Sequence, residues 1–278
     1  TASAEGVPAG TCWLGWGRSL PQLGVLGGVV TRGVWRGKGI AGRLVTDGCR
    51  AFDEARGKLL FLATTNPDAR RMYERRGFQH YVGHAFYRAA QGFSPESGFA
   101  PGQRTRARAA CWRDMAAVVP LYYLPHPCVL VDAGTFFPSI RLSPHWRCVR
   151  IFWESWASLS GGGRWMVLEN ESGWLAASAF ARPAGGVGPQ FTIDFVWHPD
   201  YCNEATALVE DLIRQTEACT GRPCEMLVAE EDEWKRVEAA RFGFRYVGRT
   251  GILFDVNGRK QALERLSRDR VFSASQRM

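Results

Sequence analysis

The sequence predicts a mixed α/β protein built from two tandem domains. Strand-like and helix-like segments alternate along the chain. A segment near residue 77 recurs near residue 243 in a fixed register. The chain has 278 residues, of which 46% are hydrophobic and 22% charged, and this length and composition suit two ordinary globular domains.

The first half predicts the order strand, strand, helix, strand, helix, strand. Two glycine-punctuated apolar runs, VPAGTCWLGWGRS and LGVLGGVVT, predict antiparallel strands joined by a hairpin. Apolar residues then recur at three- and four-residue steps from Ile40 to Arg56, which predicts an amphipathic helix that ends before Gly57. KLLFLAT predicts a buried strand, PDARRMYERRG a helix and FQHYVGHAFYRA a final strand.

The second half supplies similar elements after a polar segment. Residues 91–105 are rich in glycine, serine, proline and arginine and predict a linker between a first domain, 1–90, and a second, 106–257. ACWRDMAAVVPLY and PSIRLSPHWRCVRIFWESWASL predict helices, RWMVLENESGWLAASAFARP a hairpin and PQFTIDFVWHP a strand. Residues 258–278 predict a basic C-terminal tail.

The two halves follow one pattern at an offset of 166 residues. Gly77-Phe78 corresponds to Gly243-Phe244, and VVT corresponds to FVW in the same register. A register kept across strand, helix, strand, helix and turn indicates two copies of one fold. The second copy is predicted to be degenerate, because it replaces Arg36, Gly37, Lys38 and Gly39 by Cys202, Asn203, Glu204 and Ala205, and Tyr73 by Ala239.

Composition excludes several functional classes. The net charge of +8 favours anionic partners, but the basic residues are dispersed, so nucleic acid is not the expected partner. The eight cysteines form no C-x-x-C pair, which predicts reduced thiols and a cytoplasmic location. His80 and His84 stand four residues apart, but in a predicted strand rather than a helix, so no metal is expected. No apolar run reaches the ~18 residues that span a bilayer, and no signal peptide is visible, so no membrane association is expected.

The stretch RGKGIAG, Arg36 to Gly42, predicts an anion site. A glycine loop that enters a helix leaves backbone N–H groups unpaired at the positive end of the helix dipole. The three glycines let the backbone come close to a ligand, and the basic side chains add positive charge.

The loop matches neither of two common nucleotide-binding motifs. A P-loop requires serine or threonine after its lysine, and Lys38 is followed by Gly39. A Rossmann fingerprint requires a carboxylate at the end of the next strand, and that strand ends in Thr64-Thr65-Asn66.

A coenzyme A site fits the loop. Arg36-x-x-Gly39-x-Ala41 after a strand resembles the R/Q-x-x-G-x-G/A motif of the GCN5-related N-acetyltransferases, the GNAT superfamily. NPDARRMYERRGF, Asn66 to Phe78, is similar to that superfamily's N-x-x-A-x-x-x-Y-x-x-x-G-F segment, so the resemblance covers about residues 1–88. It implies two GNAT-like domains, each a mostly antiparallel twisted sheet flanked by helices, the first lacking the opening strand and helices of the family fold.

The resemblance implies acetyl-CoA as the co-substrate, with the loop amides on its pyrophosphate and the preceding strand on its pantetheine. The cofactor-binding residues that it implies are Val29, Val30, Thr31, Arg36, Gly37, Lys38, Gly39, Ile40, Ala41, Gly42 and Asn66. It implies Tyr73 as the catalytic general acid for the leaving thiolate. Packing under the Gly-Phe turn is the alternative role of Tyr73, and helix capping that of Asn66.

The implied reaction is acetyl transfer to a primary amine by direct attack. A small-molecule amine is the expected acceptor, with a protein amine as the alternative. The strand before the loop has no carboxylate, so the amine is expected to lose its proton through water, with His80 and His84 as further candidates. A non-catalytic acyl-CoA-binding or sensor module, or an incomplete fragment of such an enzyme, is the alternative function. The sequence does not indicate an oligomeric state.

Overall fold

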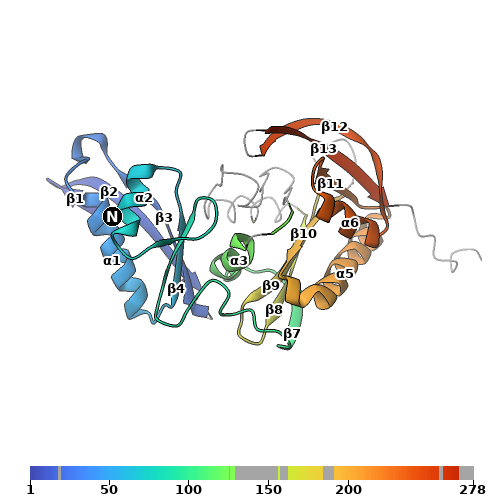
Figure 1. The fold of residues 1–278 in the computed structure, drawn as a ribbon, viewed down its shortest axis with the longest axis horizontal. Coiled ribbons are helices and arrows are strands. Elements are labelled where there is room, and N and C mark those ends of the chain that lie inside the picture. Colours follow the sequence, from blue (N-terminus) through green and yellow to red (C-terminus); the bar gives the residue numbers. More distant parts are fainter. Residues whose placement is uncertain are drawn as a thin grey trace, which may run out of the picture.

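The chain forms two sheets with helices on their faces, as Figure 1 shows for this computed structural model. Residues 1–17, 20–124, 126–128, 156, 162–183, 191–256 and 259–268 are described. The first sheet contains β1 (Ala2–Ala4), β2 (Val7–Gly17), β3 (Leu20–Thr31), β4 (Leu59–Ala63), β5 (Gln79–His80) and β6 (Ala85–Ala89), in the order β1-β2-β3-β4-β6-β5.

The second sheet has seven strands. They are β7 (Thr105–Ala109), β8 (Arg164–Asn170), β9 (Leu175–Pro183), β10 (Phe191–Trp197), β11 (Glu225–Ala229), β12 (Phe244–Val256) and β13 (Arg259–Arg268), in the order β12-β13-β11-β10-β9-β8-β7. Each sheet holds one parallel pair, β3 with β4 and β10 with β11, among antiparallel neighbours. The predicted fold class of two mostly antiparallel sheets flanked by helices is confirmed.

Two helices cover one face of the first sheet. α1 (Ile40–Glu54) and α2 (Pro67–Glu74) lie within the ranges that their apolar spacing predicts. α1 buries Val45 and Phe52 against Leu60 and Leu62 of β4. Alternation along β4 sends Leu59 and Phe61 to the opposite face of the sheet.

That opposite face is covered by a helix from the second half of the chain. α3 (Asp114–Tyr123) lies between the two sheets (Figure 1) and buries almost every residue along its length. Tyr123 packs edge-on against Phe61 of β4, with ring centroids 5.4 Å apart. Because α3 also packs against the buried residues of β9 and β10, one continuous apolar core joins the two sheets.

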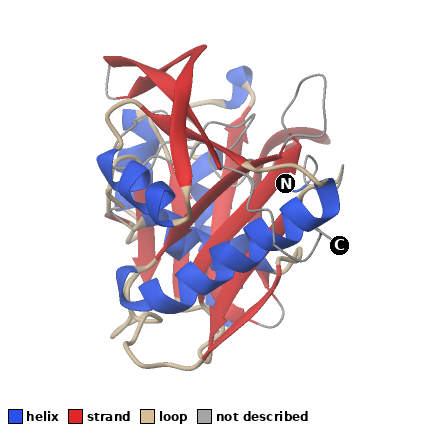
Figure 2. Cartoon of the chain, turned by 90° about the vertical axis from the view of Figure 1, so that its right-hand side faces the viewer, coloured by secondary structure: helices blue, strands red, loops and turns tan. Residues whose placement is uncertain are grey.

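The second sheet is flanked by α5 (Cys202–Thr220) and α6 (Glu233–Arg241), and Figure 2 shows helices lying across its strands. Two short 3-10 turns, η1 (Gly33–Trp35) and η2 (Pro199–Tyr201), begin 166 residues apart, as do β4 and β11. The two sheets therefore fit tandem domains of one fold. The copies diverge after the Gly-Phe pair, where the hairpin of β12 and β13 is much longer than that of β5 and β6.

Three expectations need correction. The predicted single strand after Gly77 is a short hairpin, because Gly83 takes a left-handed φ of 57° and turns the chain between β5 and β6. The predicted linker is packed, since Phe99 is buried and a Cβ on Gly98 would lie 1.9 Å from the Trp174 ring. The predicted tail starts too early, because β13 pairs with both β11 and β12.

The helix predicted within PSIRLSPHWRCVRIFWESWASL lies outside the described residues, apart from Trp156. The part of the tail beyond residue 268 also lies outside them. Within the described ranges, no helix combines the length and the apolar character that crossing a membrane requires.

Candidate functional site: a splayed strand pair and a basic glycine loop

β3 and β4 separate toward their C-terminal ends. They pair only from Leu23↔Leu59 to Val25↔Phe61, although β3 continues to Thr31. Beyond Val25, the edge of β3 that faced β4 therefore presents main-chain N–H and C=O groups to a gap. An extended ligand could use these groups as a strand would.

β3 carries a bulge at the start of this gap. On β2, only Cys12 stands between Thr11 and Trp13, whereas on β3 Gly28 and Val29 stand between their partners Gly27 and Val30. Gly28 takes a φ of 58°, which glycine adopts at little cost. A bulge re-aims the groups that it displaces from the ladder, and bulges are frequent next to active sites.

The last three residues of β3 have different surroundings. Val29 packs against the buried apolar cluster that contains Leu26 and Tyr73, whereas Val30 is 56% exposed. The hydroxyl oxygen of Thr31 is buried and has no hydrogen-bond partner in the described structure. A buried polar atom without a partner costs free energy, so Thr31 is a candidate contact for a bound molecule.

The glycine loop leads from β3 into α1 with an open backbone. Gly37 and Gly39 have φ angles of 77° and 75°, which side-chain-bearing residues rarely adopt. Nothing lies within 4 Å of where a Cβ would stand on either residue. The first bond of α1 runs from Arg43 N to Gly39 O, so the N–H groups of residues 40–42 have no acceptor within the helix.

The N-terminus of α1 is strongly positive. The described structure gives it no side-chain cap and no acidic residue in its first turn. Arg36, Lys38 and Arg43 are exposed, and none of them forms an ion pair within the described ranges. Arg36 donates to Thr31 O at 3.4 Å, and the Lys38 ammonium lies 4.3 Å from the Trp35 ring centroid. This arrangement can hold a phosphate or pyrophosphate.

Gly42 has a packing function in the same helix. A Cβ there would lie 2.1 Å from Arg76 Nη2. Arg76 donates through Nε to Gly42 O at 2.8 Å and through Nη1 to Met72 O at 2.8 Å, which ties α1 to α2. Ile40 and Ala41 are half-buried beside it.

α2 places Asn66 and Tyr73. Asn66 caps the helix, because its side-chain oxygen accepts from Asp68 N at 2.9 Å and Ala69 N at 3.3 Å. Tyr73 is buried, and its ring lies edge-on to Phe78 with centroids 5.8 Å apart. Tyr73 therefore packs under the Gly-Phe turn and Asn66 caps α2, which are the alternative roles that the sequence suggested for them. Tyr73 belongs to the apolar cluster against which Val29 of β3 also packs.

The two histidines of the β5–β6 hairpin are not equivalent. His80 donates through Nε2 to Gly83 O at 2.8 Å and packs against Phe86. His84 lies in the turn before β6. Across the described parts of the chain, no three His, Cys, Asp or Glu side chains form a group that could hold a metal ion.

Two residues of this site were missed by sequence reasoning. The Gly27-Gly28 pair inside a strand was a signal for the bulge, because glycine in a strand often marks one. Arg76 carried no distinct signal, since it stands among several arginines and its partner Gly42 lies 34 residues away. The predicted residues of β3, the loop and α1 form one continuous surface, whereas Asn66 and Tyr73 come from α2.

One family model matches the start of the chain. Residues 1–78 match the model of the acetyltransferase (GNAT) family. No curated protein sequence matches the chain. Among solved structures, yncA from Salmonella typhimurium with its cofactor acetyl-CoA is 13% identical, with a TM-score of 0.47, over 61% of this chain and 96% of that one. Spermidine N-acetyltransferase from Vibrio cholerae in complex with CoA and spermine is 14% identical, with a TM-score of 0.45, over 59% and 94%.

Proposed function

We propose that the first domain transfers an acetyl group from acetyl-CoA to a primary amine, a proposal supported by the match of residues 1–78 to the acetyltransferase (GNAT) family model. The observation that carries this proposal is the open, basic glycine loop beside the splayed end of β3. Acetyl-CoA could bind to both features, with its pyrophosphate at the glycine loop and the amide groups of its pantetheine arm along β3.

The loop would hold the phosphates of acetyl-CoA. The free N–H groups at the start of α1 and the exposed Arg36 and Lys38 supply donors and positive charge. The edge of β3 beyond Val25 would pair with the amides of the pantetheine arm, and Thr31 would gain a partner for its hydroxyl. The residues present therefore fit the donor substrate.

In the proposed reaction, the thioester of acetyl-CoA lies at the bulge of β3. The amine nitrogen attacks the thioester carbonyl carbon, and an N–H group turned out of the ladder near Gly28 stabilises the oxyanion. The carbon–sulfur bond then breaks, and the departing thiolate takes a proton from Tyr73. The attacking amine loses its own proton to water, because β3 carries no carboxylate.

A small-molecule amine is the proposed acceptor. Spermidine and spermine appear in the descriptions of proteins with a similar fold, and a protein amine is the alternative. We also propose a cytoplasmic location, because the seven described cysteines are all free thiols.

The sensor function is a second candidate that one observation favours. His80, one of the candidate bases, already donates through Nε2 to Gly83 O. Such a module would bind acetyl-CoA without consuming it.

Acetyl transfer is tested by incubating the full chain with acetyl-CoA and a panel of primary amines, with mass spectrometry of the products. Arg36→Glu is expected to lower the yield at least 10-fold, because it reverses a charge beside the phosphates. Arg222→Glu is the matched control, since Arg222 is exposed in the second domain. Binding of acetyl-CoA with no acetylated product would favour the sensor, and no binding at all would contradict both functions.

A further inference from the structure

The second sheet repeats the splay of the first. β10 pairs with β11 only at Thr192↔Glu225 and Ile193↔Met226, although β10 continues to Trp197. The gap beyond Ile193 is the counterpart of the one that β3 and β4 form. In contrast to β3, β10 has no bulge, because its pairing with β9 is unbroken from Phe191 to Trp197.

A lysine from α6 occupies this second gap. The ammonium of Lys235 donates to the carboxylate of Asp194 at 2.6 Å and to the main-chain carbonyl of Phe195 at 2.5 Å. Its side chain is only 1% exposed. Phe195 lies beyond Ile193, the last residue of β10 that pairs with β11. Lys235 therefore bonds a main-chain carbonyl on the part of β10 that has no β11 partner, as the end of β3 has no β4 partner.

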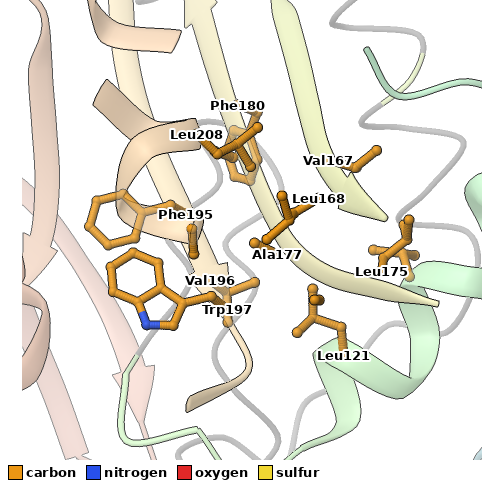
Figure 3. Packing of buried hydrophobic residues seen from close by; sticks show 14 of the residues in the cluster. Leu121, Val167, Leu168, Leu175, Ala177, Phe180, Phe195, Val196, Trp197 and Leu208 are labelled. Atoms are coloured by element: carbon orange, nitrogen blue, oxygen red, sulfur yellow. The ribbon is translucent and has the colours of Figure 1, made fainter. Parts of the chain in front are cut away.

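Aromatic rings fill the space around this ammonium. Phe195 and Trp197 point to the same side of β10 (Figure 3) and stack with centroids 4.9 Å apart. Trp234 and Phe242 pack edge-on against Phe195 at 6.3 and 5.3 Å. The ammonium lies 4.4 Å from the centroid of the Phe195 ring, a favourable cation–π distance.

Lys235 keeps its charge in this surrounding. Burial, the largest single influence, lowers the pKa of its ammonium, but Asp194, Cys128 and Asp232 together raise that pKa above its ordinary value. The charged pair therefore persists at neutral pH. In the first domain the corresponding position of α2 is Ala69, which carries neither an ammonium nor a long side chain.

The entrance to the second gap is also closed to an anion. α5 begins at Cys202 directly after η2, so no glycine loop precedes it, and Glu204 lies in its first turn. A carboxylate at this helix end satisfies the dipole that α1 leaves open.

We infer that Lys235 and the surrounding rings permanently fill, in the second domain, the space that an acyl-CoA arm takes in the first. The chain then holds one acyl-CoA, and the second domain supplies structure through α3. The inference that the chain binds one acyl-CoA rests on the proposed function, whereas the inference that Lys235 fills the second gap does not.

Hydrogen exchange tests the filling directly. Lys235→Ala is expected to raise the amide exchange rates of residues 194–197 at least 10-fold, while the exposed Lys260→Ala leaves them unchanged. If Lys235→Ala does not fold, Lys235→Met, which keeps most of the apolar stem without the ammonium, provides the same comparison. Unchanged exchange at 194–197 in a folded Lys235 variant would overturn the inference.

Saturation binding tests the number of acyl-CoA molecules that each chain binds. With acetyl-CoA as the probe, wild-type chain should bind one equivalent and Gly39→Asp none. Two equivalents, or one remaining in Gly39→Asp, would overturn the inference and leave acetyl-CoA binding established. No binding to the wild type would contradict the proposed function alone, and the exchange experiment would then decide the filling.

Discussion

Single residues of the first domain combine packing with proposed chemistry. The ring of Tyr73 packs against Phe78, which a tyrosine in a core does without any catalytic role. Val29 of β3, within the bulge, packs against the same apolar cluster that contains Tyr73. The two roles are compatible, because the ring can pack while the hydroxyl acts.

The two roles of Tyr73 can be separated by one substitution. Tyr73→Phe keeps the ring and removes the hydroxyl, so stability and the Kd for acetyl-CoA should change little. If Tyr73 protonates the leaving thiolate, kcat should fall by about 100-fold, in the range general acids contribute. Steady-state kinetics and calorimetry measure these quantities. An unchanged kcat would leave Tyr73 with packing alone.

At the scale of elements, the two helices of the first domain are joined by a polar contact. Arg76 bonds the carbonyls of Gly42 and Met72, so it spans from α1 to α2. A Cβ on Gly42 would overlap the guanidinium as it is placed, so a larger residue there requires Arg76 to shift.

Gly42→Ala should therefore destabilise the chain in spite of alanine's higher helix propensity. The clash should lower the free energy of unfolding by about 1–3 kcal/mol, as overpacking does, and urea denaturation measures it. The control is the double variant Gly42→Ala with Arg76→Ala, in which the helix gains a better former and the clash is absent. A single variant as stable as the wild type would show that Arg76 is free to move aside.

The elements were largely predictable, and the reasons are local. α1 was predicted from the spacing of Leu44, Val45, Cys49 and Phe52, all of which are buried. The Gly83 turn was missed because its neighbours, Tyr81 and Val82 on one side and Ala85 and Phe86 on the other, favour strands. β13 was missed because charged residues separate its apolar ones, and the buried Leu263 and Leu266 stand three residues apart rather than at the two-residue spacing of a strand.

Sequence motifs predicted only those residues of the candidate site that are neighbours in the chain. The loop and the end of β3 are contiguous, so their motif specified them together. The Arg76 contact and the Lys235–Asp194 pair join residues 34 and 41 positions apart, and no local pattern reports such pairings.

At the scale of the molecule, the two halves share one core. Phe61 of β4 and Ala177 of β9 lie in the same buried cluster as Leu121 of α3. The second half thus covers a face of the first sheet that would otherwise meet water. The first half should accordingly depend on the second for its stability.

Leu121→Ala tests this dependence. Leu121 is fully buried, so the substitution should cost about 2–5 kcal/mol. Hydrogen exchange should rise both in β3–β4 and in β9–β10, because one core serves both sheets. Exchange that rises only in the second sheet would show that the first half is stable by itself.

The proposed acetyl-CoA site at the glycine loop is the central claim, and calorimetric titration of acetyl-CoA into paired glycine variants tests it most directly. Gly39→Asp puts a negative charge at the start of α1, and Gly102→Asp puts the same charge at an equally open glycine with a φ of 77°, outside the proposed site. Wild type and Gly102→Asp should bind with equal Kd, and Gly39→Asp should bind at least 100-fold more weakly. Equal binding by all three proteins would contradict the claim.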